Sequence, residues 1–406
     1  MPAELITVVG ARRHVLDRIP ACGSEVAPVP FALGRVLAAD VLAAADTPPF
    51  PSSAMDGYAI RSGPAGRRLT IIGESRAGAP SRRGPGPGEA IRISTGAAVP
   101  TDADAVIAQE NVVVGNAVAG KDTIETATDV RAGDHIRMPG EDMRAGARIL
   151  EAGTRLGAIE LGAVVSAGLG EVTVAPRPHV AVLCTGDELR APGEPLGPGE
   201  IHNSNAPMLT GLAAGAGAVT DAPVRLPDDR AATRDGIGRA LEQAGVLVIS
   251  GGVSVGPHDH VKPALAELGV EEVFWSVALQ PGKPTWFGVA PEGPLVFGLP
   301  GNPVSAVVTF SLFVAPALAA MQGERGRRRL EPSAVLGTDV RRRPHREQAM
   351  RVRLERGDGP PVATPNGAQG SHVLRSLLGA DALAMIPAGD GLLSAGSLVA
   401  LEPLAG

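Results

Sequence analysis

The chain has 406 residues, more than one hydrophobic core usually supports, so we expect two or more domains. Its formal net charge of −6 argues against a general nucleic-acid binder, which is normally basic. The two cysteines, Cys22 and Cys184, provide neither a disulfide framework nor a zinc site. Charged side chains interrupt the N-terminal apolar residues, unlike a signal peptide. We therefore expect a soluble, cytoplasmic protein that binds no nucleic acid and no membrane.

The first 170 residues alternate between helical and strand patterns. Residues 5–20 and 31–44 are predicted as helices, because apolar residues recur at three- and four-residue spacing. Three prolines in DTPPFPSSAMDGYAI (46–60) end this pattern. Short alternating strands with Gly/Pro turns follow to about residue 138, which predicts a small β-rich domain. Mixed structure returns over 138–156, and 157–169 is predicted as a helix.

From about residue 176, short apolar strands alternate with helices. This order is typical of a doubly wound, mostly parallel sheet. The apolar stretch 304–321 contains Pro316 and many small residues, and we predict a buried helix there rather than a membrane span. After a basic linker at 326–332, apolar and polar residues alternate between Gly/Pro turns, which predicts a small all-β domain.

Three loops of the doubly wound region pair glycine with polar residues after predicted strands: TGDEL (185–189), SGGVSVGPHD (250–259) and LPGNPVSA (299–306). Ligands of such sheets bind beyond the carboxyl ends of the strands, where backbone N–H groups and helix dipoles favour an anion. The spacing fits neither a P-loop nor a dinucleotide fingerprint, and no nucleophile elbow is present. These loops predict an anion site of another kind.

The acidic residues of these loops admit two interpretations. Asp187, Glu188 and Asp259 would stabilise a helix dipole in a first turn, or would bind Mg²⁺, which usually takes one or two carboxylates plus substrate phosphate. His258 and His260 are two positions apart, so on a helix they point in nearly opposite directions and cannot share a metal.

Isolated cations provide a further signal. The chain has 34 arginines but only three lysines, and Lys283 lies between Gly282 and Pro284. Because the chain uses arginine almost everywhere else, a lysine with its compact ammonium group at this position favours a functional role. Arg351 in the tail is the other candidate cation.

At this point the order of motifs resembles that of the molybdopterin molybdenumtransferases, which include the bacterial MoeA proteins and the E domain of gephyrin. The resemblance covers essentially the whole chain and rests on PPFPSSAMDGYA (48–59), STGAAVP (94–100), GED (140–142), TGDEL (185–189), SNAP (204–207), SGGVSVGPHD (250–259), PGKP (281–284), LPGNPVSA (299–306) and GSHVLRSL (371–378).

The resemblance implies an α/β multidomain fold with a doubly wound, mostly parallel molybdopterin-binding domain. It also implies an elongated N-terminal domain, into which a small β domain is inserted, and a C-terminal small β-barrel. The expected boundaries are 1–45 with 140–175 for the elongated domain, 46–139 for the inserted domain, 176–325 for the doubly wound domain and 326–406 for the barrel.

The resemblance also implies an enzyme of molybdenum cofactor biosynthesis, a molybdopterin molybdotransferase. It would insert molybdate into adenylylated molybdopterin with Mg²⁺-dependent release of AMP. A separate adenylyltransferase would supply the substrate. The implied homodimer places the inserted domain of one subunit against the doubly wound domain of the other.

The site residues that the resemblance implies fall into three groups. The catalytic group is Asp56, Thr95, Asp142, Glu188 and Asp259, and the metal ligands are Asp187, Glu188 and Asp259. The substrate-binding group is Thr185, Gly186, Asp228, Ser250, Gly251, Gly252, Lys283, Pro284, Pro300, Gly301, Asn302, Ser305, Arg351 and Ser371. Within it, Lys283, Ser305, Arg351 and Ser371 would form the molybdate pocket. Many relatives have a basic residue where this chain has Gln280, so the charge there is lower. A tungstate-preferring paralogue and a non-catalytic molybdopterin-binding scaffold are the alternatives.

Overall fold

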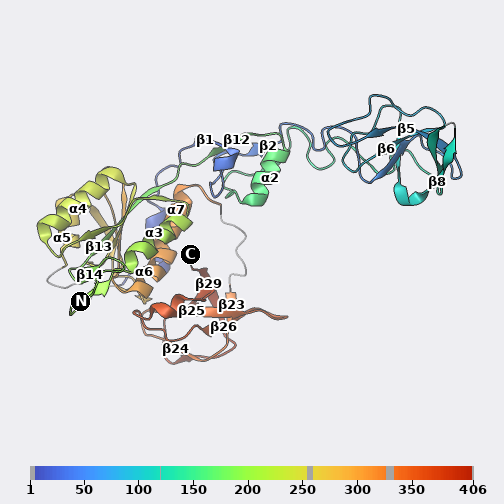
Figure 1. Cartoon of the computed structure of the whole chain (residues 1–406). Helices are drawn as coiled ribbons and strands as arrows, with labels where there is room; N and C mark the ends of the chain where they lie inside the picture. The colour runs from blue at the N-terminus through green and yellow to red at the C-terminus, as the bar shows by residue number, and fades with distance from the viewer. Residues whose placement is uncertain (1–4, 119, 254–258, 326–332, 405–406) are drawn as a thin grey trace.

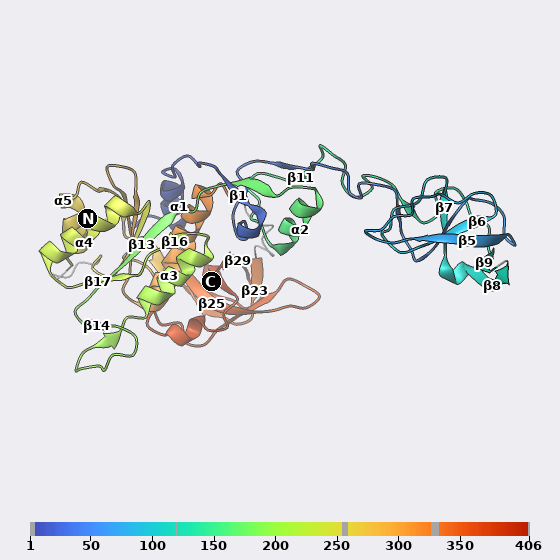
Figure 2. The same cartoon turned by 45° about the horizontal axis from the view of Figure 1, so that its top comes forward.

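The structure is a computed structural model that describes residues 5–118, 120–253, 259–325 and 333–404. The molecule is elongated (Figure 1). An α/β domain and a C-terminal β-barrel lie at one end, a slender arm leads away from them, and a separate β domain lies at the far end of the arm. Figure 2 shows the same separation from a second direction.

The α/β domain is built on a twisted sheet whose central strands are parallel. Its strands run in the order β16 (Val219–Thr220), β13 (His179–Thr185), β18 (Val246–Ser250), β22 (Leu295–Leu299), β21 (Trp286–Val289) and β19 (Glu271–Trp275), and β17 (Val224–Leu226) also pairs with β13. The last two strands are antiparallel to their neighbours. The carboxyl ends of β13, β18 and β22 therefore share one edge of the sheet.

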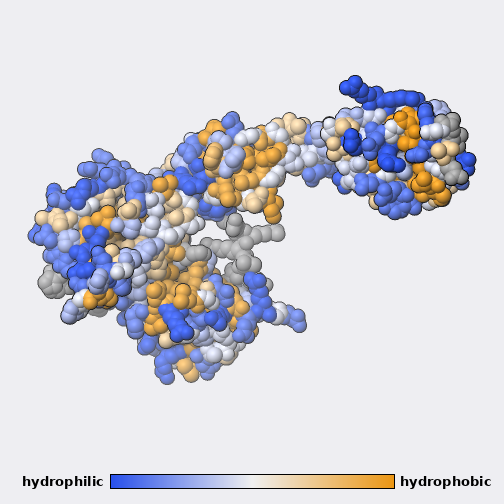
Figure 3. All heavy atoms as spheres, in the orientation of Figure 1, coloured by the Kyte–Doolittle hydropathy of each residue, from blue (hydrophilic) through white to orange (hydrophobic). Residues whose placement is uncertain are grey.

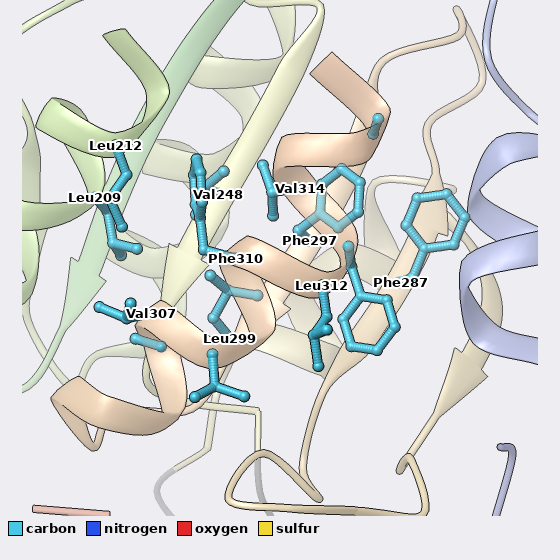
Figure 4. Close-up of a cluster of buried hydrophobic side chains, with 14 of the residues drawn as sticks. Leu209, Leu212, Val248, Phe287, Phe297, Leu299, Val307, Phe310, Leu312 and Val314 are labelled. Carbon is cyan, nitrogen blue, oxygen red and sulfur yellow. The ribbon is translucent and has the colours of Figure 1, made fainter. Parts of the chain in front are cut away.

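Helices cover both faces of this sheet because side chains alternate along each strand. In β18, Val246 and Val248 pack into one core, whereas Leu247 and Ile249 pack into the other. The first core is covered by α3 (Asn205–Gly215) and α6 (Pro303–Thr309), and the second by α4 (Arg230–Gln243) and α5 (Val261–Glu267). Figure 4 shows the first core, where Leu209 and Leu212 of α3 face Val248, Phe310 and their neighbours.

The predicted buried helix is one continuous helical stretch with a π-helical turn. It comprises α6, η3 (Phe310–Val314) and α7 (Ala315–Met321). Pro316 has no N–H to donate to the carbonyl of Leu312, and that carbonyl instead accepts from Nε of Arg12 at 3.1 Å. The stretch is long and apolar enough to cross a membrane by composition, but most of it lies inside the first core, which confirms the prediction of a buried helix.

The arm departs from the sequence prediction at one point. The first predicted helix, α1 (Val8–Leu16), is present and packs into the first core of the α/β domain, but the helix predicted over 31–44 in the arm is wrong. A short 3-10 turn, η1 (Val29–Phe31), is followed by Gly34 at φ +74°, a conformation that ends a helix. The apolar residues beyond it face the arm's core from extended backbone. The arm also contains α2 (Ala158–Ser166) and the antiparallel pairs β1 (Glu25–Pro28) with β12 (Glu171–Val174) and β2 (Val41–Leu42) with β11 (Arg148–Leu150).

The inserted domain is a sheet of short strands. Its order is β7 (Ala105–Ala108), β4 (Gly57–Ile60), β6 (Glu89–Ile93), β5 (Arg68–Ser75), β9 (Lys121–Thr126) and β8 (Val112–Val118). A small antiparallel pair, β3 (Ser52–Ser53) with β10 (Ile136–Arg137), lies where the chain enters and leaves the domain.

The C-terminal domain is a closed barrel. β25 (Glu347–Glu355), β26 (Val362–Pro365), β23 (Ser333–Leu336), β29 (Leu398–Pro403) and β27 (Ala382–Ile386) pair in that order, and β27 pairs back with β25. β20 (Leu279–Gln280) of the α/β domain adds to β25 and joins the two domains. The predicted fold class is confirmed.

Candidate functional site

A cavity of about 750 Å³ lies at the carboxyl ends of β13, β18 and β22, where the three predicted loops meet. This is the edge at which open α/β sheets bind ligands. The predicted site residues that line it are Thr185, Glu188, Ser250, Gly251, Gly252, Pro284, Pro300, Gly301 and Asn302.

Glycine allows these loops to approach one another. Gly251 has φ +92°, and a Cβ there would lie 2.7 Å from the Thr185 hydroxyl oxygen. Its backbone N–H donates to the carbonyl of Leu299 at 3.0 Å, so the β18 loop is fixed to the end of β22. Larger side chains at this position would separate the walls of the cavity.

Asn205, the first residue of α3, connects two of the loops. Its Nδ2 donates to the hydroxyl oxygen of Ser250 at 2.8 Å and to the carbonyl oxygen of Gly301 at 2.7 Å. A carbonyl can only accept, so these contacts define the orientation of the amide. The Asn205 side chain lines the cavity and belongs to the SNAP motif, yet it was absent from the predicted site.

Other lining residues were also missed by sequence reasoning. They are Cys184, Leu189, Ile201, His202, Asn203, Ser204, Val253, Pro303, His372 and Leu374. Burial raises the pKa of the Cys184 thiol to about 11, so this thiol stays protonated near neutral pH. His202 ends β15, and Asn203 and Ser204 connect it to α3. The SNAP motif, which begins at Ser204, was the sequence signal nearest to them.

Asp187 and Asp228 lie together beside the cavity. The Asp187 N–H donates to Oδ2 of Asp228 at 3.3 Å, and the Asp228 N–H donates to Oδ1 of Asp187 at 3.4 Å. They come from the loops after β13 and β17, and both are exposed. Two carboxylates with free oxygen lone pairs are the ligands that Mg²⁺ prefers beside a substrate phosphate.

The structure corrects the helix-dipole interpretation of these acids. After Gly186 the chain enters β14 (Leu189–Arg190) and β15 (Ile201–His202), and the next helix, α3, begins only at Asn205. Asp187 and Glu188 therefore do not lie in the first turn of a helix. Asp259 precedes α5, which begins at Val261, so its placement in a first turn is also wrong.

Residues 254–258, including His258, lie outside the described residues. In the part of the chain that the structure describes, no three His, Cys, Asp or Glu side chains are close enough to hold a metal by themselves. The assignment of Asp187, Glu188 and Asp259 as metal ligands remains a prediction.

The predicted molybdate-pocket residues flank the start of α6. Lys283 is exposed and directly precedes Pro284 of the cavity lining, whereas Ser305 is buried within α6. Ser371 of the barrel accepts at its hydroxyl from Nδ2 of Asn302 at 3.2 Å, and at its carbonyl from the N–H of Val304 at 3.2 Å. The barrel thereby docks onto the beginning of α6.

Arg351 is the most deeply buried cation of this region. Its side chain is on β25, and the residue is 1% exposed. Nε donates to the Ser376 hydroxyl at 3.1 Å, and Nη2 donates to the carbonyl of Gly370 at 3.3 Å. Burial lowers its pKa to about 10, which leaves it charged near neutral pH. Within the described residues it forms no salt bridge, so this positive charge is not neutralised by a carboxylate.

Asp56 and Thr95 meet in the inserted domain. Both the N–H and the hydroxyl of Thr95 donate to Oδ1 of Asp56, at 2.7 and 3.0 Å. These hydrogen bonds lower the pKa of the Asp56 carboxyl. Asp142 is exposed near the junction with the arm, where its N–H donates to the carbonyl of Thr47 at 2.9 Å. The arm separates the inserted domain, which contains Asp56 and Thr95, from the cavity of the same chain (Figure 1).

These features define a multidomain α/β protein with a ligand-sized cavity at the carboxyl ends of its parallel strands. Family models agree with this division: the MoeA N-terminal region (domain I and II) matches residues 6–168, a probable molybdopterin binding domain matches 181–320, and the MoeA C-terminal region (domain IV) matches 333–404. The chain belongs to the molybdopterin molybdenumtransferase family, the MoeA proteins.

Individual relatives match nearly the whole chain. Molybdopterin molybdenumtransferase 2 of Mycobacterium tuberculosis (strain CDC 1551 / Oshkosh) is 36% identical over 93% of this chain and 94% of its own length. The molybdopterin molybdenumtransferase of Haemophilus influenzae is 33% identical over 98% of both chains. A solved structure of the molybdopterin biosynthesis MoeA protein from Pyrococcus horikoshii has a TM-score of 0.80 and 30% identity, and the match covers 98% of this chain and 100% of that one.

Proposed function

We propose that this chain is a molybdopterin molybdenumtransferase that inserts molybdate into adenylylated molybdopterin and releases AMP in molybdenum cofactor biosynthesis. The observation that carries the proposal is the cavity at the carboxyl ends of β13, β18 and β22, with Glu188 in its lining and the Asp187–Asp228 pair beside it. The family membership supports the same reaction.

The donor set at the rim of the cavity fits Mg²⁺. Asp187, Asp228 and Glu188 are exposed carboxylates, and a substrate phosphate would complete the coordination. Mg²⁺ held there would withdraw charge from the phosphate oxygens during cleavage of the phosphoanhydride. Glu188 lies in the cavity wall, where its carboxylate would orient the attacking group or the metal-bound phosphate. Asp259 would contribute from the loop before α5.

The molybdate end of the site would lie between α6 and the barrel. An oxyanion is bound best by fixed N–H, hydroxyl and cationic donors. Lys283 and the unneutralised charge of Arg351 supply positive potential there, and Ser371 supplies a hydroxyl at the start of α6. Gln280 pairs with Gln348 of β25 in this region and adds no charge, so Lys283 would carry more of the binding.

A homodimer would complete the active site. The inserted domain, which contains the Asp56–Thr95 pair, lies at the far end of the arm from the cavity of its own chain, so only a second copy would bring the pair to that cavity (Figure 2). Asp142, the third predicted residue, would approach it in the same way. Figure 3 shows apolar side chains gathered on the arm, and the exposed apolar residues there include Phe31, Leu33, Ile159 and Val165. Exposed patches of this kind mark association surfaces.

We also propose how the substrate is supplied and where in the cell the reaction takes place. A separate adenylyltransferase would supply the substrate, and the reaction would take place in the cytoplasm without a nucleic-acid or membrane partner.

The test mixes purified protein with adenylylated molybdopterin, Mg²⁺ and molybdate, and follows AMP release by chromatography. Release that requires both molybdate and Mg²⁺ is expected. Binding of the substrate without any release would instead identify a molybdopterin-binding scaffold. Faster release with tungstate than with molybdate would identify a tungstate-preferring paralogue.

A further inference from the structure

The arm meets the α/β domain through polar contacts rather than through a shared core. Within the described residues, the apolar cluster of the arm, which includes Leu37 and Leu156, has no member in common with the first core of the α/β domain. Three turns meet there instead: residues 151–156 of the arm, the turn after α3 and the end of α7. Figure 1 shows α7 beside the start of the arm. Directional contacts at these turns therefore set the angle between the arm and the α/β domain.

Arg155 connects the three turns through its guanidinium group. Its Nε and Nη2 donate to the two carboxylate oxygens of Glu324, just after α7, at 3.0 and 2.7 Å. Nη1 donates to the carbonyl of Gly34 in the arm at 2.7 Å, and Nη2 also donates to the carbonyl of Ala216, the residue after α3, at 3.4 Å. Both charged side chains of the pair are 14% exposed. Because two parallel hydrogen bonds define direction as well as distance, this ion pair holds the arm at one angle.

The turns around the Arg155–Glu324 pair are packed too closely for additional side chains. Gly217 has φ +88°, and a Cβ there would lie 2.6 Å from Nη1 of Arg155. Gly153 also has φ +88°, and a Cβ there would lie 2.9 Å from the carbonyl oxygen of Gly323. The carbonyl of Gly153 accepts from the N–H of Arg325 at 3.0 Å. The guanidinium therefore has little space in which to take another position.

The angle at the base of the arm matters because the inserted domain lies at the other end (Figure 2). A small rotation at the base becomes a larger displacement at the Asp56–Thr95 pair. The arm also exposes the apolar residues of the proposed association surface. In a dimer joined through the arms, this angle would decide where each cavity faces the inserted domain of the other subunit. A misplacement of about 1 Å between reacting groups can lower a rate by about a hundredfold.

We propose that Arg155 and Glu324 are positioning residues for the composite active site. They hold the α/β domain and the arm at the angle that brings the Asp56–Thr95 pair of one subunit to the cavity of the other. Neither residue lines that cavity, so they act on the reaction only through the geometry of the domains. The inference rests on the proposed function, because it uses a site shared between two subunits.

Spin labels in the full-length protein measure the angle as a distance between domains. Asp122→Cys in β9 and Glu242→Cys in α4 place labels at exposed positions of the inserted domain and the α/β domain. Cys22→Ser is included throughout because Cys22 is exposed, whereas Cys184 is buried and stays unlabelled. Subunit exchange with a roughly tenfold excess of unlabelled protein leaves mostly one labelled chain in each dimer. Double electron–electron resonance then reports the distance within one chain.

The unmodified pair should give one narrow distribution of distances. Arg155→Met should widen this distribution by about twofold or more, because the paired hydrogen bonds that define the angle are lost. The control is Arg12→Met. Arg12 forms an ion pair of similar exposure with Glu402 but joins α1 to the barrel, so its loss should leave the distance unchanged. An unchanged width in Arg155→Met would overturn the proposal.

A double variant separates positioning from stability. Arg155→Met alone leaves the carboxylate of Glu324 unpaired, which destabilises the fold, whereas Arg155→Met with Glu324→Met leaves no unpaired charge. The double variant should therefore unfold at a higher denaturant concentration than the single variant but keep the wide distribution. A double variant as narrow as the unmodified protein would show that the pair serves stability alone, and would also overturn the proposal.

The AMP-release assay provides the functional measurement. The double variant should lower kcat by about tenfold or more, while the substrate concentration for half-maximal rate stays within about twofold, because the cavity itself is intact. An unchanged kcat with a widened distribution would remove the positioning role. Absence of AMP release in the unmodified protein would instead contradict the proposed function, and the distance measurement would still report whether the pair sets the angle of the arm.

Discussion

The α/β cavity and the Asp56–Thr95 pair differ in how they are assembled. Three loops of the α/β domain, α3 and the loop of the barrel that contains Ser371 converge on the cavity. Hydrogen bonds from Asn205 and Asn302 fix these segments to one another. The pair in the inserted domain is held just as firmly, by two hydrogen bonds from one threonine, but it stands on an open surface at the end of an arm.

The difference teaches that one chain builds a complete binding pocket but only part of the proposed catalytic site. The cavity needs nothing from a second copy for its shape. The inserted domain supplies fixed polar groups on an exposed surface. A preformed pocket and a remote set of polar groups are the pieces expected when a symmetric dimer places its active sites between subunits.

The largest effect is expected for Glu188 in the cavity wall. Glu188→Ala should lower the rate of AMP release by about a hundredfold or more, because the proposed function places this carboxylate beside the reacting phosphate. The matched control is Glu242→Ala, which removes an exposed carboxylate of α4 outside the cavity and should keep the full rate. Sizing chromatography should show the same assembly for both variants. Full activity in Glu188→Ala would remove this residue from the chemistry.

The comparison itself is tested by mixing two inactive variants. Glu188→Ala damages the cavity and Asp56→Asn damages the Asp56–Thr95 pair of the inserted domain. If each site takes one part from each subunit, a mixed dimer has one site with both defects and one with neither. Exchanged mixtures should then regain about a quarter of the unmodified activity, since half of the dimers are mixed and each has one intact site. Recovery no greater than the sum of the separate variants would place the whole site within one chain.

The local sequence predicted the strands but not every turn that follows them. The buried runs ending at Thr185, Ser250 and Leu299 became parallel strands whose loops meet, as the alternation with helices indicated. No helix follows TGDEL directly. The proline-rich residues 191–200 instead form a loop between β14 and β15, and α3 begins only after β15. Asn205 was missed for a related reason. Its importance lies in contacts with residues 45 and 96 positions away, which no local pattern contains.

A smaller effect is expected at the glycine that closes the cavity. Gly251→Ala should cost about 1–3 kcal/mol of unfolding free energy, because alanine is strained at positive φ and its Cβ would press on Thr185. Gly215→Ala in α3 should instead be neutral or stabilise by up to about 1 kcal/mol, since alanine favours a helix. Denaturant unfolding measures both. Equal stabilities for the two variants would show that the β18 loop adapts without cost.

The two lysines of the α/β domain provide the next comparison. Lys283→Ala should raise the molybdate concentration needed for half-maximal AMP release by about tenfold, with little change for the pterin substrate, because the variant loses one cation of the proposed oxyanion pocket. Lys262 has its ammonium 3.8 Å from the ring centroid of Trp275 and does not line the cavity, so Lys262→Ala should change neither value. Equal effects of Lys283→Ala on molybdate and pterin would move this lysine out of the oxyanion pocket.

The smallest effect is expected from acid titration of Asp56. The two hydrogen bonds from Thr95 favour the charged carboxylate, so the pKa of Asp56 lies below its ordinary value of 3.8. The stability that this group contributes is therefore present above 3.8 and is lost as the pH falls through the lower value of the folded state. In a carbon-13 NMR titration, Thr95→Val should move the pKa of Asp56 upward, because the hydroxyl donor is gone while the backbone donor remains. An unchanged titration would assign the whole shift to the backbone. A carboxyl held charged in this way is a poor proton acceptor at neutral pH, so Asp56 would act in a composite site through its charge and hydrogen bonds, while proton transfer would rest with groups of the cavity such as Glu188.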